Sequence, residues 1–366
     1  MAVPTIFVLY LCSVTAPTPL TVANPPNPWH STEVDWLGEP PDASLQVFEE
    51  RAKSIVSISE SPDLGRMASI NPYRGCFHGC AYCYARPSHQ YLGFGAGTDF
   101  ERKIVVKVNA VELLRDELER TRWRGDAIVL SGNTDCYQPL EVSYRLTRGL
   151  LQVAAEYKNP VRIITKSALV RRDADILGAL AREAEVGVTV SIPFADDQMA
   201  RLIEPWAAKP SLRFEAVRAL VDAGVPVGVN LAPIIPGLND DDIPELLERA
   251  HAAGATRAGL IPVRLPAEVA PVFMARLHAA VPLRAAKVES ALRQIRGGKL
   301  YDARFGKRMT GEGPRWAAVR ALFDAHKRKL GLGGHDGEDA FEPRNVAPAT
   351  STFRRPRAQL TLFPGD

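Results

Sequence analysis

Three cysteines lie close together in the first quarter of the chain, within the segment NPYRGCFHGCAYCY that runs from Asn71 to Tyr84. They are Cys76, Cys80 and Cys83, so three residues and then two separate successive thiols. Thiolates at such short spacing are ligands for a metal ion or an iron–sulfur cluster. The segment therefore predicts a metal centre held by a single loop.

A 4Fe-4S cluster fits this spacing best. Three protein thiolates on four irons leave one iron open to a substrate, as a catalytic cluster requires. Gly75 and Gly79 leave the backbone free to wrap around a bulky ligand. The alternative is a structural zinc, which would need His78, His89 or Cys136 as a fourth ligand. In that case the protein would be a non-catalytic nucleic-acid-binding module stabilised by zinc.

Composition sets broad limits on the protein. The chain has 366 residues, of which 46% are hydrophobic and 24% charged, so it can bury one large core. A net charge of +3 is too small to indicate a nucleic-acid partner by itself. Five cysteines with one tight cluster do not resemble a secreted disulfide framework, and they favour metal chemistry in a reducing, cytoplasmic compartment.

The two ends of the chain are expected to lie outside the folded core. The apolar run Ile6–Cys12 lacks a basic flank and is too short to span a bilayer, so we expect no membrane association. We interpret residues 1–45 as a disordered or mis-called N-terminal extension. Residues 332–366, rich in Gly, Pro, Ser and Thr, are expected to form a flexible tail.

Between these ends, short β-branched runs alternate with helical patterns, which is typical of a parallel sheet built from βα units. Six units predict an α/β fold with a partial (β/α)6 TIM-like barrel over residues 46–266, followed by a helical C-terminal region over 267–331. The expected strands are Met67–Arg74, Ala127–Gly132, Val161–Ser167, Val186–Pro193, Val225–Ile235 and Arg257–Leu265.

Polar residues follow or end several of these strands. In parallel sheets ligands bind at the carboxyl ends of the strands, so such residues are candidates for binding. An ordinary turn and helix cap would explain the Asn-Thr-Asp sequence after the second strand equally well. The candidates are Ser131, Asn133, Thr134 and Asp135 following the second strand, Lys166 at the end of the third, Ser191 at the end of the fourth and Asn230 in the fifth.

The cysteine motif, with an aromatic residue before its last cysteine, resembles that of the radical S-adenosylmethionine superfamily. More narrowly, Asn71–Arg86, Ser131–Glu141 and Ala232–Asp240 resemble the bacterial radical S-adenosylmethionine proteins grouped with spore photoproduct lyase, a DNA repair photolyase-like family. The similarity runs from about residue 52 to the C-terminus. It implies a lyase-like enzyme that reductively cleaves S-adenosylmethionine to a 5′-deoxyadenosyl radical, which abstracts hydrogen from a substrate. It also implies an electron donor such as flavodoxin or ferredoxin.

The resemblance further implies roles for individual residues. Ser131–Asp135 would form the loop that binds the methionine amino group, with Asp135 pairing with the ammonium. Lys166 would reach the methionine carboxylate, while Ser191 and Asn230 would contact the ribose. Pro236 lies in the stretch near the adenine, where backbone groups do most of the binding.

Catalytic roles follow less directly from the resemblance. Tyr82 and Tyr84 match tyrosines near the cluster that take part in hydrogen return in spore photoproduct lyase. The cysteine donor of that enzyme lies three residues before the loop aspartate, where this chain has Gly132. Cys136 lies one residue after Asp135 and would need a different loop geometry to act as the donor. Packing alone would also explain Tyr84, and Cys136 as a small buried residue.

Two further features indicate a nucleic-acid setting. Arg296, Lys299, Arg304, Lys307, Arg308, Arg315 and Arg320 lie near Tyr301, Phe305 and Trp316, a mixture that could grip phosphates and stack bases. A solvated helical face would look similar. The peptide Gln359–Phe363 resembles the short segments by which bacterial repair and replication proteins bind the sliding clamp, although it could instead fold back on the domain.

Overall fold

Seven strands form the main sheet of the computed structural model, which describes residues 44–333 and 351–356. The strand order is β10-β9-β8-β7-β6-β3-β2, and all neighbours are parallel except β2 (Val56–Ser61) and β3, which form an antiparallel hairpin. The six parallel strands confirm the expected partial barrel. They are β3 (Gly65–Ile70), β6 (Ile128–Leu130), β7 (Val161–Thr165), β8 (Val186–Ser191), β9 (Val227–Ile234) and β10 (Arg257–Pro262).

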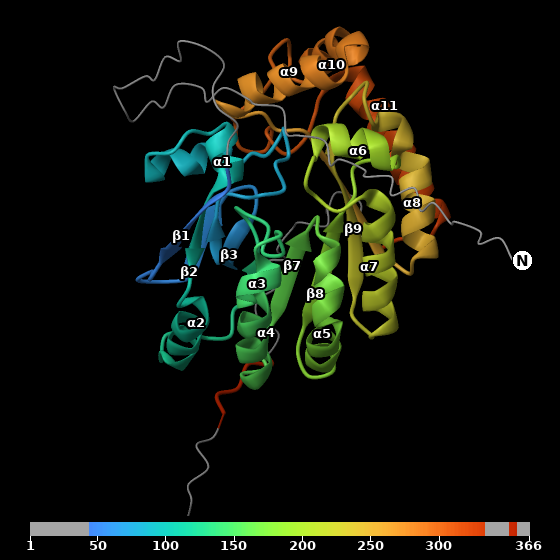
Figure 1. Ribbon diagram of the computed structural model, residues 1–366. Helices are drawn as coiled ribbons and strands as arrows, with labels where there is room; N and C mark the ends of the chain where they lie inside the picture. Colours follow the sequence, from blue (N-terminus) through green and yellow to red (C-terminus); the bar gives the residue numbers. More distant parts are fainter. Residues whose placement is uncertain (1–43, 334–350, 357–366) are drawn as a thin grey trace, which may run out of the picture.

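Helices follow the strands and cover the outside of the sheet (Figure 1). The strands are rich in Val, Ile and Leu because parallel strands in such folds are covered on both faces. The main core lies between them and the helices, where Leu151, Val217 and Leu247 pack with Val188 and Val229. The covering helices are α2 (Ala110–Glu119), α4 (Leu146–Glu156), α5 (Ala174–Ala181), α7 (Pro210–Asp222) and α8 (Ile243–Ala252).

A second, small sheet was not expected from the sequence. Its order is β1-β5-β4, formed by β1 (Gln46–Glu50), β5 (Lys103–Lys107) and β4 (Tyr73–Arg74). The strand expected over Met67–Arg74 is therefore wrong in its second half. The chain leaves the main sheet after Ile70, where Asn71-Pro72 interrupts the strand, and proline cannot donate to a sheet ladder. The cysteine loop consequently starts from the small sheet.

Shorter elements connect these strands and helices. They are η1 (Arg86–Leu92), α1 (Thr98–Arg102), α3 (Glu141–Tyr144), η2 (Ala168–Asp173), α6 (Asp197–Ile203) and η3 (Asp240–Asp242).

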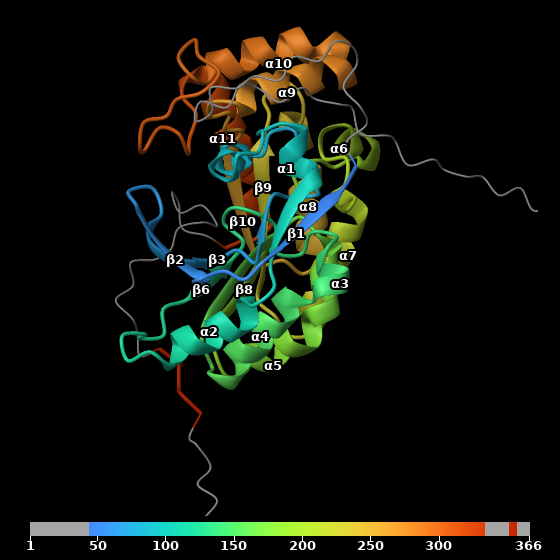
Figure 2. The same ribbon diagram turned by 60° about the vertical axis from the view of Figure 1, so that its left-hand side comes forward.

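Three helices follow the barrel, namely α9 (Val269–Ala280), α10 (Pro282–Gln294) and α11 (Gly313–Lys329). Both views place α9 and α10 across one end of the barrel (Figures 1 and 2). Their apolar side chains share a cluster with Cys80 and Tyr82, so this helical region forms part of the wall around the cysteine loop. Helix α11 lies beside α8, and its residues Trp316 and Phe323 belong to the main core.

Part of the expected flexible tail is placed against the barrel. Phe353 is buried and stacks on Tyr157, with ring centroids 6.3 Å apart. Arg355 donates to the carbonyl of Leu118 at 3.1 Å. Residues 351–356 thus lie at the end of the molecule opposite to α9 and α10 (Figure 1). The predictions for residues 1–43 and for Gln359–Phe363 fall outside the described residues.

Candidate active site

A cavity of about 260 Å³ opens at the carboxyl ends of the parallel strands. Its wall includes the cysteine loop, the loop after β6, the ends of β7 and β8, and parts of β9 and β10. The cavity brings together twelve of the residues selected from the sequence: Cys76, Cys80, Tyr82, Cys83, Tyr84, Ser131, Asn133, Thr134, Asp135, Lys166, Ser191 and Asn230.

Two selected residues do not line this cavity. Cys136 is fully buried in the main core, where its backbone N–H donates to Ser131 Oγ at 3.0 Å. Burial raises the pKa of the Cys136 thiol well above its usual range. Pro236 lies in the turn after β9, and the neighbouring Ala232 and Pro233 line the cavity instead. The structure therefore places neither residue beside the cysteine cluster.

The cysteine loop is held by its backbone. Gly75 and Gly79 have φ values of +77° and +67°, a left-handed conformation that glycine adopts readily. A Cβ atom on Gly79 would also lie only 3.1 Å from a Glu101 carboxylate oxygen. Gln138 accepts from the Phe77 backbone N–H at 2.9 Å and donates to the Gly75 carbonyl at 3.2 Å. The loop thus has a fixed path, with its three thiols at one cavity.

A buried ionic group supports this loop from behind. The Arg86 side chain donates to the Cys80 carbonyl at 2.8 Å and also contacts Glu101. Arg276, from α9, donates to the Gly79 carbonyl and to Glu101, the latter at 3.1 Å. Burial lowers the pKa of Arg276, although Glu101 opposes that shift. One carboxylate and two guanidinium groups therefore fix the middle of the cysteine motif.

The chemistry of the three thiols fits a metal cluster. Burial raises the pKa of Cys76, Cys80 and Cys83 above the usual range, so without a metal these groups hold their protons. A bound metal cation replaces those protons and stabilises the thiolates. Within residues 44–333 and 351–356, no three His, Cys, Asp or Glu side chains are grouped tightly enough for a single metal ion. Three thiols lining one cavity provide the number of thiolates that leaves one iron of a 4Fe-4S cluster open to a ligand.

Asp135 ties the loop after β6 to the end of β7. Its carboxylate accepts from the Tyr137 N–H at 2.9 Å, from Thr165 Oγ1 at 2.7 Å and from the Lys166 N–H at 2.7 Å. His78 Nδ1 lies 3.5 Å from the same carboxylate. Burial lowers the pKa of His78 to about 4, so its ring is neutral at pH 7. Much of the hydrogen-bonding capacity of Asp135 is therefore used within the protein.

Lys166 and Asn230 face the same cavity with capacity for a ligand. Lys166 Nζ contacts the Ala232 carbonyl at 3.3 Å and lies 5.6 Å from the Tyr82 ring centre. Burial lowers the pKa of Lys166, while the neighbouring Cys80 opposes the shift. The Asn230 side-chain oxygen is buried and has no hydrogen-bond partner. An unsatisfied buried acceptor is costly, so this oxygen favours a hydroxyl-bearing ligand in the cavity.

A second buried ion pair supports the cavity wall. Tyr82 donates through its hydroxyl to Glu204, which also accepts from Arg213. Arg213 donates to the Ser191 carbonyl at 2.8 Å, so the pair connects the cysteine loop with the end of β8. Sequence reasoning missed Glu204 and Arg213, because nothing in their local sequence distinguishes them from surface charges.

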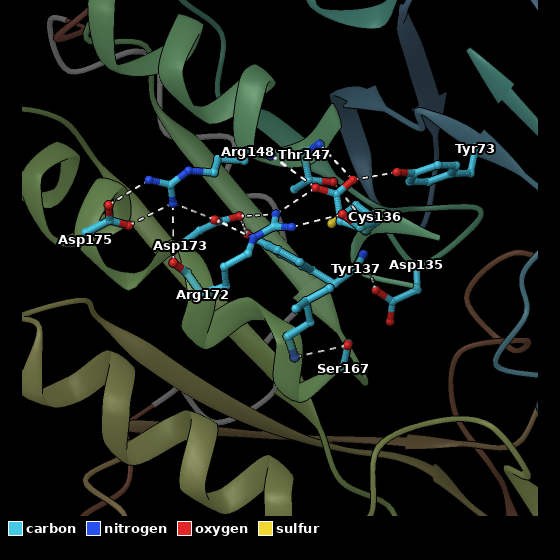
Figure 3. Close-up of polar contacts among 12 residues, drawn as sticks. Tyr73, Asp135, Cys136, Tyr137, Thr147, Arg148, Ser167, Arg172, Asp173 and Asp175 are labelled. Atoms are coloured by element: carbon cyan, nitrogen blue, oxygen red, sulfur yellow. Dashed lines mark hydrogen bonds and ion pairs between the residues drawn. The ribbon is translucent and has the colours of Figure 1, made fainter. Parts of the chain in front are cut away.

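A third network positions the loop from Ser131 to Glu141 (Figure 3). The buried Glu141 carboxylate accepts from Tyr73 Oη at 2.5 Å and from the Thr147 N–H at 3.0 Å. Tyr137 donates through its hydroxyl to Asp173 at 3.0 Å. Arg148 and Arg172 pair with these carboxylates and with Asp175. Figure 3 shows Asp175 and Tyr73 at opposite ends of the network, so the contacts join the loop to both the small sheet and η2.

Residues 70–250 match the family model of the Radical SAM superfamily. The match begins at the last residue of β3 and includes all three cysteines and every selected cavity residue.

Two curated relatives are uncharacterized proteins. One, from Mycobacterium tuberculosis, is 38% identical over 216 residues, which cover 58% of this chain and 64% of that protein. The other, from Methanocaldococcus jannaschii, is 29% identical over 199 residues, which cover 54% of this chain and 71% of that protein. The match thus spans less than two thirds of the mycobacterial protein.

Among solved structures, the chain is similar in fold to spore photoproduct lyase. The structure of that enzyme with bound AdoMet and dinucleoside spore photoproduct has a TM-score of 0.54 and 17% sequence identity. The similar region covers 81% of this chain and 85% of the lyase. The family uses a 4Fe-4S cluster and S-adenosylmethionine, which agrees with a cavity lined by three thiols and by polar side chains. The chain therefore contains a Radical SAM superfamily domain, which spans residues 70–250.

Proposed function

We propose that the protein is a radical S-adenosylmethionine enzyme that abstracts hydrogen from a nucleic-acid substrate, in a DNA repair-like reaction. The observation that carries this proposal is the single cavity at the carboxyl ends of the strands, which gathers three thiols and the polar residues suited to the cofactor. In such folds this end of the barrel carries the chemistry.

Cys76, Cys80 and Cys83 would hold the 4Fe-4S cluster. When bound and reduced, the cluster would supply the electron for cleavage of the sulfonium bond of S-adenosylmethionine, the source of the radical that abstracts hydrogen. The Arg86 and Arg276 contacts to the loop carbonyls keep the three thiols on one wall of the cavity. Reduction would come from a donor such as flavodoxin or ferredoxin.

Other residues of the cavity wall would bind S-adenosylmethionine. Lys166 provides a cation for the methionine carboxylate, and the unpartnered Asn230 oxygen provides an acceptor for a ribose hydroxyl. Ser191, held by Arg213 through its carbonyl, lies on the same wall. Asp135 already accepts three hydrogen bonds from the protein, so we propose that it mainly shapes the loop that receives the methionine amino group.

Two tyrosines line the cavity together with the cysteines. The Tyr82 hydroxyl is buried against Glu204, whereas Tyr84 is 43% exposed and donates to the Gly132 carbonyl at 2.5 Å. Because Cys136 lies in the core and Gly132 has no side chain, we propose Tyr84 as the residue that contacts the substrate radical. We propose no cysteine of the loop after β6 as a hydrogen donor.

Isotope transfer tests the substrate class. The reconstituted protein would be incubated without oxygen with S-adenosylmethionine, a reductant and single-stranded DNA deuterated on its sugars and bases. We expect deuterium to appear in the released 5′-deoxyadenosine, detected by mass spectrometry. Release of unlabelled 5′-deoxyadenosine would still support the enzyme class but would exclude this DNA as the source of hydrogen. Tyr84→Phe should alter the products without preventing S-adenosylmethionine binding.

A further inference from the structure

Some residues of the cavity lining have no place in the proposed cofactor site. They are Leu64 and Met67 from the β2–β3 hairpin, Arg264 after β10, and Arg308 and Met309 from the loop that precedes α11. These residues come from three separate segments that meet at the cavity. Two guanidinium groups, those of Arg264 and Arg308, therefore lie in this part of the lining.

Arg308 has a partner within the protein. Its side chain pairs with Asp63 and donates to Ser61 Oγ at 2.8 Å, which fastens the loop to the β2–β3 hairpin. Its guanidinium also lies 4.4 Å from the centre of the Phe305 ring, and that ring is 57% exposed. Arg308 thus joins the loop to the hairpin and lies beside an exposed aromatic side chain.

Arg264 has no such partner. Among the described residues, no carboxylate forms an ion pair with it, and its buried Nε has no hydrogen-bond acceptor. Its Nη1 donates to the Met309 sulfur, a weak acceptor, at 3.1 Å. The guanidinium lies 4.8 Å from the centre of the Tyr84 ring. Arginine is always charged in proteins, so a partly buried one without an acid favours an anionic ligand.

The basic stretch noted in the sequence is largely accounted for by internal contacts. Arg296 is buried and donates to the carbonyls of Val263 and Lys307, at 3.0 and 2.9 Å. Arg304 pairs with Asp302 at 2.5 Å. The side chain of Arg296 therefore builds the loop that carries Met309 rather than binding a phosphate. Arg264, which the sequence reasoning did not select, is a cation of the cavity lining that forms no ion pair with a described carboxylate.

We propose that Arg264 binds a backbone phosphate of a nucleic-acid strand whose nucleotide enters the cavity beside Tyr84. This inference rests on the proposed function and specifies how its substrate is recognised. A planar guanidinium suits phosphate oxygens, and the exposed Tyr84 and Phe305 rings offer surfaces on which bases can stack. The phosphate supplies the negative charge that the protein itself does not place beside Arg264.

Binding of a fluorescent oligothymidylate to the reconstituted holoenzyme tests the proposal. We compare wild type with Arg264→Gln and Arg264→Lys, and with Arg304→Gln as a matched loss of one exposed guanidinium. Arg264→Gln should weaken binding about 10- to 100-fold, the range expected for one charged hydrogen-bonded contact. It should also reduce the slope of log K against log salt by about 0.7. Arg264→Lys should restore part of the affinity, and Arg304→Gln should retain it.

A second probe keeps the test informative if a variant folds poorly. An oligothymidylate with neutral methylphosphonate linkages should bind wild type more weakly than the natural strand does. Wild type and Arg264→Gln should bind this neutral strand equally weakly. Equal binding of both strands by wild type would overturn the proposal, as would Arg264→Gln that binds like Arg304→Gln. Equilibrium dialysis with S-adenosylmethionine provides a further check, because a similar loss of cofactor affinity in Arg264→Gln would assign the arginine to the cofactor.

The two proposals fail in different ways. Wild type that binds DNA through Arg264 but forms no 5′-deoxyadenosine would refute the proposed function and leave the phosphate contact standing. Wild type that cleaves S-adenosylmethionine but binds DNA without the help of Arg264 would refute the phosphate contact and leave the proposed function standing.

Discussion

Glu101→Gln should destabilise the protein strongly, although Glu101 lies outside the cavity lining. Its side chain and those of Arg86 and Arg276 are 2%, 0% and 3% exposed. Removing the carboxylate leaves two buried guanidinium groups without a counter-charge, a change that costs about 3–5 kcal/mol in other buried ion pairs. Since domains are stable by only about 5–15 kcal/mol, this loss is a large fraction of the total.

Urea unfolding of the metal-free protein, followed by circular dichroism, measures the effect. Glu156→Gln is the matched control, because Glu156 and its partner Arg115 are each 46% exposed and such surface pairs contribute at most about 1 kcal/mol. The glutamine variant at position 101 should also bind less iron on reconstitution, since Arg86 and Arg276 hold the carbonyls of Cys80 and Gly79. Equal stability of the two variants, with full iron content in both, would refute this account of the loop.

Three further predictions concern other parts of the chain. Phe353→Ala should lower the free energy of unfolding in urea by about 2–4 kcal/mol, because it removes the buried ring that packs on Tyr157. An unchanged free energy of unfolding would mean that residues 351–356 do not pack against the barrel. Burial lowers the pKa of His89 to about 4, whereas this side chain in the unfolded chain is protonated near pH 6.5, so the protein should lose stability as the pH falls from about 6.5 to 4. His89→Leu should reduce this loss by up to about 3 kcal/mol. The same dependence of unfolding free energy on pH in both proteins would contradict a buried, neutral His89. Cys136→Ala should form 5′-deoxyadenosine within about twofold of wild type, as a core substitution away from the reacting atoms, whereas complete loss of activity in a folded variant would return this cysteine to the site.

Local patterns in the sequence predict the barrel because each strand carries its own signal. The runs that form β7, β8 and β9 are β-branched, bounded by turns and buried, so their positions follow from the sequence without knowledge of their neighbours. The small sheet lacks such signals. Strand β1 is almost wholly exposed and β4 has only two residues, so their pairing with β5 depends on contacts far apart in the chain.

The residues of the candidate site also differ in whether local sequence can identify them. Lys166 and Asn230 could be selected because ligands bind where parallel strands end, and both line the cavity. That rule also applies to Arg264, which follows β10 in an apolar stretch, so the signal was present but unused. Glu101 and Arg276 could not be selected, since their pairing depends on packing between α1 and α9.

Within the described parts of the chain, no helix has both the length and the apolar character needed to cross a bilayer. The predicted contact of Gln359–Phe363 with the sliding clamp stays a prediction. Clamp-binding measurements on the full chain and on a chain that ends at Ala358 would test it, and equal binding by both would remove it.

The most direct test of the central claim is metal analysis combined with electron paramagnetic resonance of protein reconstituted without oxygen. Wild type should hold about four irons, and the spectrum of its reduced cluster should change when S-adenosylmethionine is added. Cys80→Ala should lose both the cluster signal and the formation of 5′-deoxyadenosine. A colourless wild type that holds zinc, or a Cys80→Ala variant with full iron and full cleavage of S-adenosylmethionine, would contradict the account.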